Sequence, residues 1–250
     1  MKNKRRYKKS SVAKTIFLGV VMLAAAVAFA IGGKEGILHD RSVSVVKISL
    51  DAKVQIRPVL CSSKQVSDAF PELMKELKPY AAINGTYYDD SFKPIGDILI
   101  DGKLVNRGGQ KNAIAIKKNG KVRFIHRGRR GFDWSGCTAG LAAGPRLVHK
   151  GKVALDPTAD GFSKRSLQIE ARRSGVGLTA KGSLLLITVN RNIKLKEFAR
   201  IMLDLGAVEA MNLDGGGACA LYHDGKTITS PTLPMTNLLV VYKKQGTDNR

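Results

Sequence analysis

The sequence predicts an α+β fold: a single domain with a largely antiparallel or mixed sheet and few helices, preceded by an N-terminal hydrophobic export helix. Most of the chain after residue 42 consists of short apolar or alternating segments joined by glycine turns such as Asp101-Gly102 and Asn119-Gly120. This pattern is typical of antiparallel strands. Only two segments have apolar residues at helical spacing. The roughly 220 residues that follow the leader are enough for one domain with a sizeable core.

The N-terminus has the layout of an export signal. Residues 1–14 carry seven lysines and arginines and no acid, and residues 15–33 are almost wholly apolar. Ala28-Phe29-Ala30 offers a small-x-small cleavage site, although the apolar run is also long enough for a tilted membrane span. We therefore expect a chain that is exported to the periplasm or the extracellular space. Residues 1–33 are either a cleaved signal peptide or an anchor that holds the chain in the inner membrane through residues 15–33.

The remaining chain divides into a linker at 34–42, a domain at 43–244 and a short tail at 245–250. Alternating apolar residues predict a hairpin of strands 42–50 and 54–60.

A first helix is predicted at 67–77, where Phe70, Leu73, Met74 and Leu77 share one face and Pro79 ends the helix. A short apolar strand follows at 80–83.

The second half of the domain is expected to contain two clear hairpins and one helix. The strand pairs are 113–116 with 122–125 and 174–179 with 183–189. The helix at 195–205 has one apolar stripe and ends at Gly206, a glycine in the usual C-terminal capping position. The segments 128–137 and 156–170 are predicted to be loops, and 238–242 a closing strand.

The formal net charge of the chain is +22, of which the leader supplies only seven cations. A domain this basic attracts anions. Nucleic acid is one candidate partner, but an export signal speaks against it. An anionic envelope polysaccharide or a phosphate-bearing substrate agrees with both the charge and the export signal.

The most unusual stretch of the domain is Asp214-Gly215-Gly216-Gly217, which follows an apolar strand-like segment at 208–213. An ionised carboxylate at the end of a buried strand loses hydration, so its placement is costly. Consecutive glycines expose backbone N–H groups and let a ligand come close. The alternative is a plain hairpin turn, for which Asp-Gly is a common signal. We interpret this stretch as a functional site.

Two segments share the same shape, because each is an apolar strand that delivers an amide side chain and a glycine turn. These are Ile83-Asn84-Gly85 and Asn212-Leu213-Asp214-Gly215. With Arg173, they would supply neutral donors, a cation and a carboxylate. Such a set suits a sugar phosphate, since amides bind hydroxyls and a guanidinium binds phosphate oxygens.

These segments resemble the phosphodiester glycosidase domain, the family of N-acetylglucosamine-1-phosphodiester α-N-acetylglucosaminidase. The matching segments, in chain order, are Ile83-Asn84-Gly85-Thr86-Tyr87-Tyr88-Asp89, Pro94-Ile95-Gly96, Asp101-Gly102-Lys103, Ala143-Gly144-Pro145-Arg146-Leu147-Val148, Lys150-Gly151-Lys152, Arg173-Ser174-Gly175-Val176-Gly177, and Asn212-Leu213-Asp214-Gly215-Gly216-Gly217. The resemblance extends over roughly residues 43–243. The chain departs from the family pattern at Ser174 (usually Thr), Gly175 (usually Ala) and Ala218 (usually Ser).

The resemblance implies hydrolysis of a glycosyl-1-phosphodiester, in which water attacks the anomeric carbon and a phosphomonoester leaves. It suggests Asp214 as the catalytic carboxylate and Asp97 as a reserve second acid. Arg173 would hold the phosphate, with Arg146 and Arg172 as weaker candidates. The substrate-binding residues would be Asn84, Gly85, Tyr88, Arg173, Asn212, Gly215, Gly216 and Gly217. Asp89 and Asp90 are expected to be turn residues.

No cofactor and no metal site are predicted, because the four histidines are scattered and none is spaced with cysteine as in zinc sites. A calcium ion held by acids alone would leave no such pattern. The three cysteines allow at most one disulfide and one leftover thiol, or three buried thiols acting as small apolar residues.

Two other functions share the same residues. One is a non-catalytic module that binds an anionic polysaccharide, and the other is a glycosidase that cleaves an ordinary glycosidic bond. The leading hypothesis is an exported hydrolase of glycosyl-1-phosphodiester bonds in envelope or extracellular polysaccharide.

Overall fold

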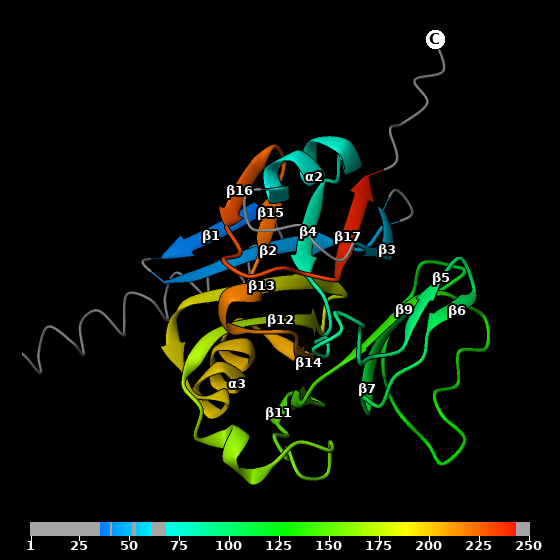
Figure 1. The fold of residues 1–250 in the computed structure, drawn as a ribbon, viewed down its shortest axis with the longest axis vertical. Helices are drawn as coiled ribbons and strands as arrows, with labels where there is room; N and C mark the ends of the chain where they lie inside the picture. Colours follow the sequence, from blue (N-terminus) through cyan, green and yellow to red (C-terminus); the bar gives the residue numbers. More distant parts are fainter. Residues whose placement is uncertain (1–35, 41, 52–53, 62–68, 244–250) are drawn as a thin grey trace, which may run out of the picture.

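The computed structural model describes residues 36–40, 42–51, 54–61 and 69–243. The predicted signal peptide or anchor at 1–33, and with it the export helix, lies outside the described residues, as does the predicted tail at 245–250. Within the described ranges, no helix is long and apolar enough to cross a membrane. The domain consists mostly of antiparallel β-sheets with two α-helices (Figure 1).

The largest sheet has seven strands in the order β1-β2-β13-β12-β14-β10-β11. Their bounds are β1 Gly36–Asp40, β2 Val43–Ser49, β13 Ser183–Ile193, β12 Ala171–Thr179, β14 Ala207–Asn212, β10 Arg146–His149 and β11 Lys152–Val153. All neighbouring strands are antiparallel. Strand β14 lies between β12 and β10, so its last residue, Asn212, is delivered to the interior of the molecule.

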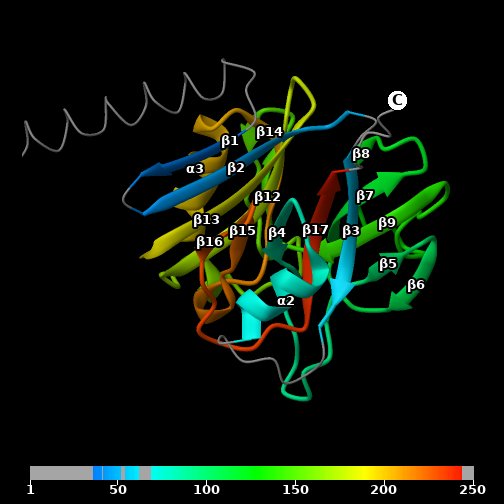
Figure 2. The same cartoon turned by 90° about the horizontal axis from the view of Figure 1, so that it is seen from above.

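Two five-stranded sheets complete the fold, and their paired strands are also antiparallel. The second sheet has the order β16-β15-β4-β17-β3, and the third has the order β6-β5-β9-β7-β8. The bounds are β3 Val54–Leu60, β4 Ala81–Asn84, β5 Ile98–Ile100, β6 Lys103–Asn106, β7 Asn112–Lys117, β8 Val122–His126, β9 Cys137–Ala143, β15 Leu221–His223, β16 Lys226–Thr229 and β17 Asn237–Lys243. The third sheet forms a separate lobe beside β3 (Figure 2).

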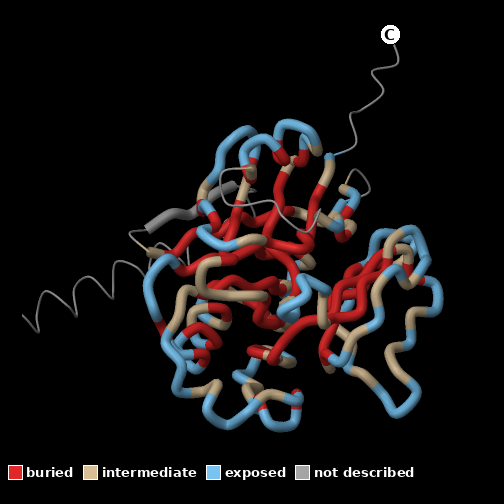
Figure 3. Tube along the Cα trace, viewed as in Figure 1, coloured by how far each residue is buried: buried red, intermediate tan, exposed pale blue. Residues whose placement is uncertain are grey.

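One apolar cluster joins all three sheets, with members such as Leu186, Ile83 and Ile114 fully buried. The strands alternate, so the opposite face of the seven-stranded sheet carries a second cluster, covered by helix α3 (Leu195–Asp204). Helix α2 (Phe70–Leu77) covers the outer face of the second sheet. Figure 3 shows the buried trace concentrated between these layers, so the core lies where the sheets meet.

Several local predictions are confirmed. The hairpin β7–β8 and the hairpin β12–β13 form where the glycine turns placed them. Helix α3 ends as expected, with Leu205 as its C-cap and Gly206 at a φ of 87°. The loop predicted at 156–170 contains one short 3₁₀ helix, η2 (Lys164–Leu167).

Pairings between distant strands differ from the sequence expectation. Strand β1 occupies part of the predicted linker, because its backbone pairs with β2 from Gly36↔Lys47 to Asp40↔Val43. The expected hairpin of β2 with β3 does not form: β2 pairs with β1 and β13, whereas β3 pairs with β17 of another sheet. Strand β3 alternates between buried and more exposed positions, whereas β2 is buried on both faces from Val43 to Ile48. The predicted alternation of the first strand is therefore not found, and alternation would not have identified the partner strands. The mixed-sheet alternative is also not realised among the described strands.

Candidate active site

The candidate site lies where β14 of the seven-stranded sheet and β4 of the second sheet end next to each other. The Asp214 N–H donates to the Gly85 carbonyl at 3.0 Å, and the Leu213 N–H donates to the Ser174 carbonyl at 2.9 Å. The glycine run is therefore connected by backbone hydrogen bonds to strands of both sheets. This connection fixes the position of the Asp214 backbone between the two sheets.

The Asp214 side chain is half-buried. Its Oδ1 accepts the Gly215 N–H at 2.8 Å. Burial disfavours the ionised form and raises the pKa of Asp214 from 3.8 to about 6, while the Gly215 hydrogen bond opposes that shift. Because its pKa lies just below neutrality, the carboxylate is ionised at pH 7 yet more basic than an ordinary aspartate, which suits acid–base chemistry.

Two side chains converge on the backbone carbonyl of Asp214. The Asn84 amide donates to it at 2.7 Å, and the Ser174 hydroxyl donates to it at 2.6 Å. The Asn84 carbonyl oxygen in turn accepts the Ala220 N–H at 3.0 Å. Asn84, which the sequence suggested as a substrate-binding amide, thus holds the backbone on both sides of the glycine run. Ser174 has the same positioning role, and sequence reasoning did not assign it one.

Asn212 and Tyr87 form a second buried contact beside Asp214. The Tyr87 hydroxyl donates to the Gly144 carbonyl at 2.5 Å and accepts a hydrogen bond from the Asn212 amide at 2.6 Å. Burial raises the pKa of Tyr87, and the nearby Asp214 charge raises that pKa further. The Asn212 Oδ1 is buried without a hydrogen-bond partner among the described residues. A buried acceptor without a partner is an exception in folded proteins and marks a candidate contact for a ligand hydroxyl.

Tyr87 was not among the predicted site residues, because the sequence analysis chose the neighbouring Tyr88. Tyr88 stacks on Phe92 with ring centroids 5.3 Å apart, and Phe92 is exposed. Burial, followed by the Asp214 charge, raises the pKa of Tyr88. The signal for Tyr87 was available, since consecutive residues of an extended segment point in opposite directions and only one of the two tyrosines can face Asn212.

Arg173 is buried beside this cluster, and its guanidinium is held by backbone carbonyls. Its Nε donates to the Ile193 carbonyl at 3.0 Å, and its Nη2 donates to the Ile169 carbonyl. Burial lowers the pKa of Arg173, although the nearby Tyr87 and Cys219 raise it. The two carbonyls use two of the five N–H groups of a guanidinium. Arg173 therefore places a positive charge next to Tyr87.

The two weaker candidates for phosphate binding, Arg172 and Arg146, form other contacts. The Arg172 Nη2 donates to Asn190 Oδ1 at 3.0 Å and to the Ser230 carbonyl at 3.4 Å. Arg146 donates its backbone N–H to Asp160 Oδ2 at 2.7 Å.

Each of the three glycines is required at its position for its own structural reason. Gly216 begins the 3₁₀ turn η3 (Gly216–Ala218) and has a φ of 60°, a left-handed conformation that favours glycine. A side chain at Gly217 would lie 2.5 Å from Leu233 Cγ, and one at Gly215 would lie 2.9 Å from the Arg172 carbonyl. The run is thus a tight crossing of chain segments, and not the two-residue hairpin turn that was the alternative.

Asp97 lies in a different environment from Asp214. It precedes β5 (Ile98–Ile100) in the third sheet, where its Oδ1 accepts the Gly108 N–H at 2.7 Å and forms an ion pair with Arg127 Nη1 at 3.2 Å. The Asp97 side chain is only 3% exposed. No hydrogen bond or ion pair between described residues links Asp97 to Asp214. Asp89 has the predicted turn role, because its Oδ1 accepts the N–H groups of Ser91 and Lys93.

The three cysteines are free thiols. Cys219 is fully buried beside the glycine run, and burial raises its pKa to about 12. It therefore acts as a small apolar residue, which was one of the two alternatives. Among the described residues, no group of histidine, cysteine, aspartate or glutamate side chains is arranged to hold a metal ion.

Comparisons with solved structures show the fold. The chain is similar to a hypothetical protein from Synechocystis, with a TM-score of 0.71 and 17% identity over 84% of this chain and 61% of that one. It is also similar to the zebrafish N-acetylglucosamine-1-phosphodiester α-N-acetylglucosaminidase catalytic domain auto-inhibited by its pro-peptide, with a TM-score of 0.66 and 19% identity over 84% of this chain and 82% of that one. A protein from Burkholderia pseudomallei K96243 matches with a TM-score of 0.60 and 14% identity over 80% of this chain and 73% of that one.

The chain spans 61% of the length of the Synechocystis protein. No curated protein matches the chain in sequence. The family comparison is decisive, because the model of the phosphodiester glycosidase family matches residues 78–242, a range that begins before β4 and ends in β17. That range contains Asn84, Tyr87, Arg173, Asn212 and Asp214. The chain therefore belongs to the phosphodiester glycosidase family.

Proposed function

We propose that this protein is an exported hydrolase that cleaves glycosyl-1-phosphodiester bonds in envelope or extracellular polysaccharide. Family membership supports the reaction class. The observation that carries the proposal for this chain is the environment of Asp214, a half-buried carboxyl whose pKa is raised to about 6. A poorly hydrated carboxylate whose backbone is held by hydrogen bonds can take up a proton or stabilise positive charge in a reacting sugar.

The proposed reaction breaks the bond between the anomeric carbon and the phosphate oxygen. A water oxygen bonds to the anomeric carbon, and the electron pair of the breaking bond goes to the phosphate, which leaves as a phosphomonoester. The water gives up a proton, for which the Asp214 carboxylate is the acceptor, and the same negative charge stabilises the oxocarbenium-like transition state. Because a phosphate leaves more readily than an alkoxide, a second carboxyl group that protonates it is dispensable. The ion pair of Asp97 with Arg127 agrees with a single catalytic carboxylate.

The neighbouring polar groups have complementary roles in the proposal. The Asn212 Oδ1 is a free acceptor for a sugar hydroxyl. Arg173 supplies the positive charge that attracts the phosphate, through the N–H groups that do not bind backbone carbonyls. Asn84 and Ser174 keep the Asp214 backbone in place, so they are positioning residues.

Two parallel substrates test this function. The purified full chain would be incubated with an α-N-acetylglucosamine-1-phosphodiester and with an aryl α-glycoside of the same sugar, and released sugar would be measured. Release from the phosphodiester alone supports the proposal. Release from the aryl glycoside at an equal or higher rate would instead identify an ordinary glycosidase. Binding of an anionic polysaccharide without release from either compound would identify a non-catalytic module.

A further inference from the structure

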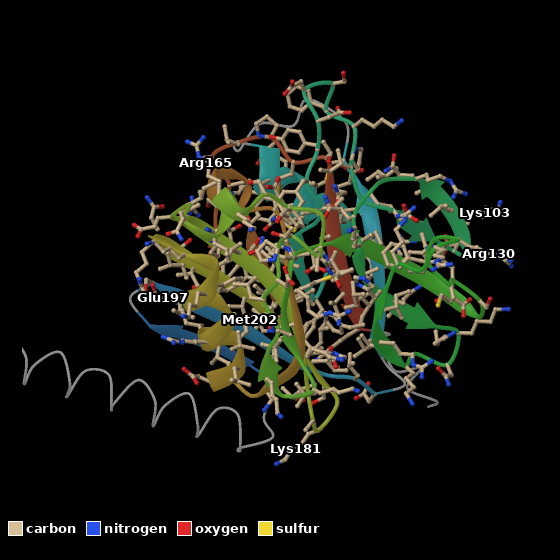
Figure 4. All side chains as sticks on the ribbon, turned by 90° about the horizontal axis from the view of Figure 1, so that it is seen from below. Lys103, Arg130, Arg165, Lys181, Glu197 and Met202 are labelled. Atoms are coloured by element: carbon tan, nitrogen blue, oxygen red, sulfur yellow. The ribbon has the colours of Figure 1, made fainter. Side chains whose placement is uncertain are left out.

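The third sheet carries a concentration of positive charge that the candidate active site does not use. Residues 102–132 contain ten lysines and arginines and no aspartate or glutamate. Among the described residues, only Arg127 of these ten forms an ion pair, and its partner is Asp97. Lys103 and Arg130 project from this lobe in Figure 4. A surface with so many unneutralised cations attracts polyanions.

Four of these ten cations lie around one hollow at the tip of the β7–β8 hairpin. The hollow has a volume of about 450 Å³ and is lined by Lys117, Lys118, Asn119, Lys121, Arg123 and Gly136. We call it the basic hollow. None of its lining residues is acidic or aromatic.

The cations of the basic hollow are carried by a turn that several hydrogen bonds stabilise. The Lys117 N–H donates to the Lys121 carbonyl at 2.9 Å, and the Gly120 N–H donates to the Lys117 carbonyl at 2.9 Å. The Lys118 N–H donates to the Gly136 carbonyl at 3.1 Å, which connects the turn to the loop before β9. The Lys117 ammonium donates to the Ser135 carbonyl. These contacts fix the backbone from which the cations project, and they hold the Lys117 ammonium in place, so less chain has to be ordered when a ligand binds.

The basic hollow lies at the far end of the strand that leads to the candidate active site. Strand β7 begins at Asn112, which pairs with Ala143 next to the Gly144 carbonyl that accepts the Tyr87 hydroxyl. It ends at Lys117, on the edge of the basic hollow. At about 3.4 Å per residue, the two ends of this six-residue strand are about 17 Å apart. One polymer chain could therefore occupy both places.

A second hollow extends the basic region toward β3. It has a volume of about 550 Å³ and shares Lys117, Lys118 and Asn119 with the basic hollow, while Arg57 of β3 lies on its wall. It also includes Asp51 and Asp101, so its charge is mixed. The strongest attraction for an anion is thus in the basic hollow itself.

The chemistry of the lining indicates the ligand. Ammonium and guanidinium groups bind phosphate oxygens, and Asn119 can bind hydroxyls. Proteins that bind single-stranded nucleic acid add aromatic side chains on which bases stack, and the basic hollow has none. We propose that the basic hollow binds the phosphodiester groups of an anionic glycan chain and holds that polymer at a distance from Asp214. The glycan as ligand class rests on the proposed function, but binding itself requires no hydrolysis.

A binding experiment with charge-matched variants tests this site. The full chain would be titrated with a purified capsular polysaccharide that has phosphodiester links, with neutral dextran as a control and at low and high salt. One variant combines Lys118→Gln, Lys121→Gln and Arg123→Gln, which removes three cations of the basic hollow. The matched variant combines Lys103→Gln, Arg129→Gln and Arg130→Gln, three exposed cations that do not line it. Thermal unfolding of both variants checks that each is folded.

We expect the first variant to lose affinity on the order of tenfold or more and to show a weaker salt dependence. The matched variant should lose much less, and Asp214→Asn should bind like the wild type. Equal losses in the two triple variants, or no binding of the polysaccharide by the wild type, would overturn the proposal. Tighter binding of a single-stranded oligonucleotide than of the polysaccharide would also overturn it, in favour of nucleic acid. Polysaccharide binding without sugar release would keep this site and reject the proposed hydrolysis.

Discussion

The side-chain amide of Asn84 donates a hydrogen bond to the backbone carbonyl of Asp214, 2.7 Å away and 130 residues along the chain. Asn84 ends β4, and Asp214 lies two residues after the end of β14 in another sheet, so this bond joins the two sheets at the candidate catalytic carboxylate. It also gives Asn84 a role that its residue type alone does not reveal. Several measurable consequences depend on this junction.

Replacement of Asn84 should destabilise the fold and reduce activity together. Asn84→Ala removes the donor to the Asp214 carbonyl and leaves the Ala220 N–H without its acceptor. We expect the free energy of unfolding to fall by roughly 2 kcal/mol, measured by chemical denaturation. Asn84→Asp keeps an acceptor for Ala220 but loses the donor, so it separates the two contacts. An unchanged denaturation midpoint in Asn84→Ala would show that the junction is dispensable.

Gly85 should tolerate no side chain, because a Cβ there would lie 1.8 Å from Asn237 Oδ1. That oxygen accepts the Thr86 N–H at 2.8 Å, so the clash would break a buried contact. Gly85→Ala should lower the free energy of unfolding by about 1–3 kcal/mol. Gly109→Ala is the matched control, since nothing lies within 4 Å of the added Cβ there. Equal stability of the two variants would contradict the packing described around Gly85.

The Tyr87 hydroxyl should matter for activity although it is buried. Tyr87→Phe removes the contact between the Gly144 carbonyl and the Asn212 amide while keeping the ring, which meets Phe162 edge to face. We expect sugar release to slow by roughly tenfold, because Asn212 loses one of the groups that orient it. Tyr88→Phe, whose hydroxyl makes no such contact among the described residues, is the comparison. Steady-state rates of sugar release would be measured for both variants. A larger loss of rate in Tyr88→Phe than in Tyr87→Phe would assign the role to the Tyr88 hydroxyl instead.

The raised pKa of Asp214 predicts a pH dependence of both activity and stability. The ionised form acts in the proposed reaction, so the rate should rise as the pH increases through about 6. The folded protein keeps a proton that the unfolded chain loses near its ordinary pKa of 3.8. The free energy of unfolding should therefore decrease as the pH rises from about 4 to 6, by up to about 3 kcal/mol. Asp214→Asn should lack this fall in stability, and a wild-type rate that decreases through pH 6 would indicate an acid role.

Local features of the fold could be predicted from the sequence because local chemistry determines them. The glycine turns placed the β7–β8 and β12–β13 hairpins, and the apolar stripe with Gly206 placed helix α3. The partners of strands could not be predicted, since β2 and β3 are consecutive in the chain but belong to different sheets. Periodicity reports which face is buried, and it contains no information on the neighbour that buries it.

In the candidate site, too, features set by local sequence could be predicted and contacts between distant segments could not. Asp214 and the glycine run stand out because a carboxylate and three glycines at a strand end are unusual. The contacts of Asn84, Ser174 and Tyr87 with the site depend on segments far apart in the chain, so residue type alone could not assign them. The ion pair of Asp97 with Arg127 likewise becomes visible only once the third sheet is assembled.

The role of Asp214 is tested most directly by comparing Asp214→Asn with Asp97→Asn, after both variants are shown to be folded. The measurement is the rate of sugar release from an α-N-acetylglucosamine-1-phosphodiester. A single catalytic carboxylate at Asp214 predicts a loss of roughly 10³-fold or more in Asp214→Asn. Asp97→Asn should stay within about tenfold of the wild-type rate, because the substitution weakens a structural ion pair. Sugar release by Asp214→Asn at the wild-type rate, or an equally large loss in a folded Asp97→Asn, would contradict Asp214 as the single catalytic carboxylate.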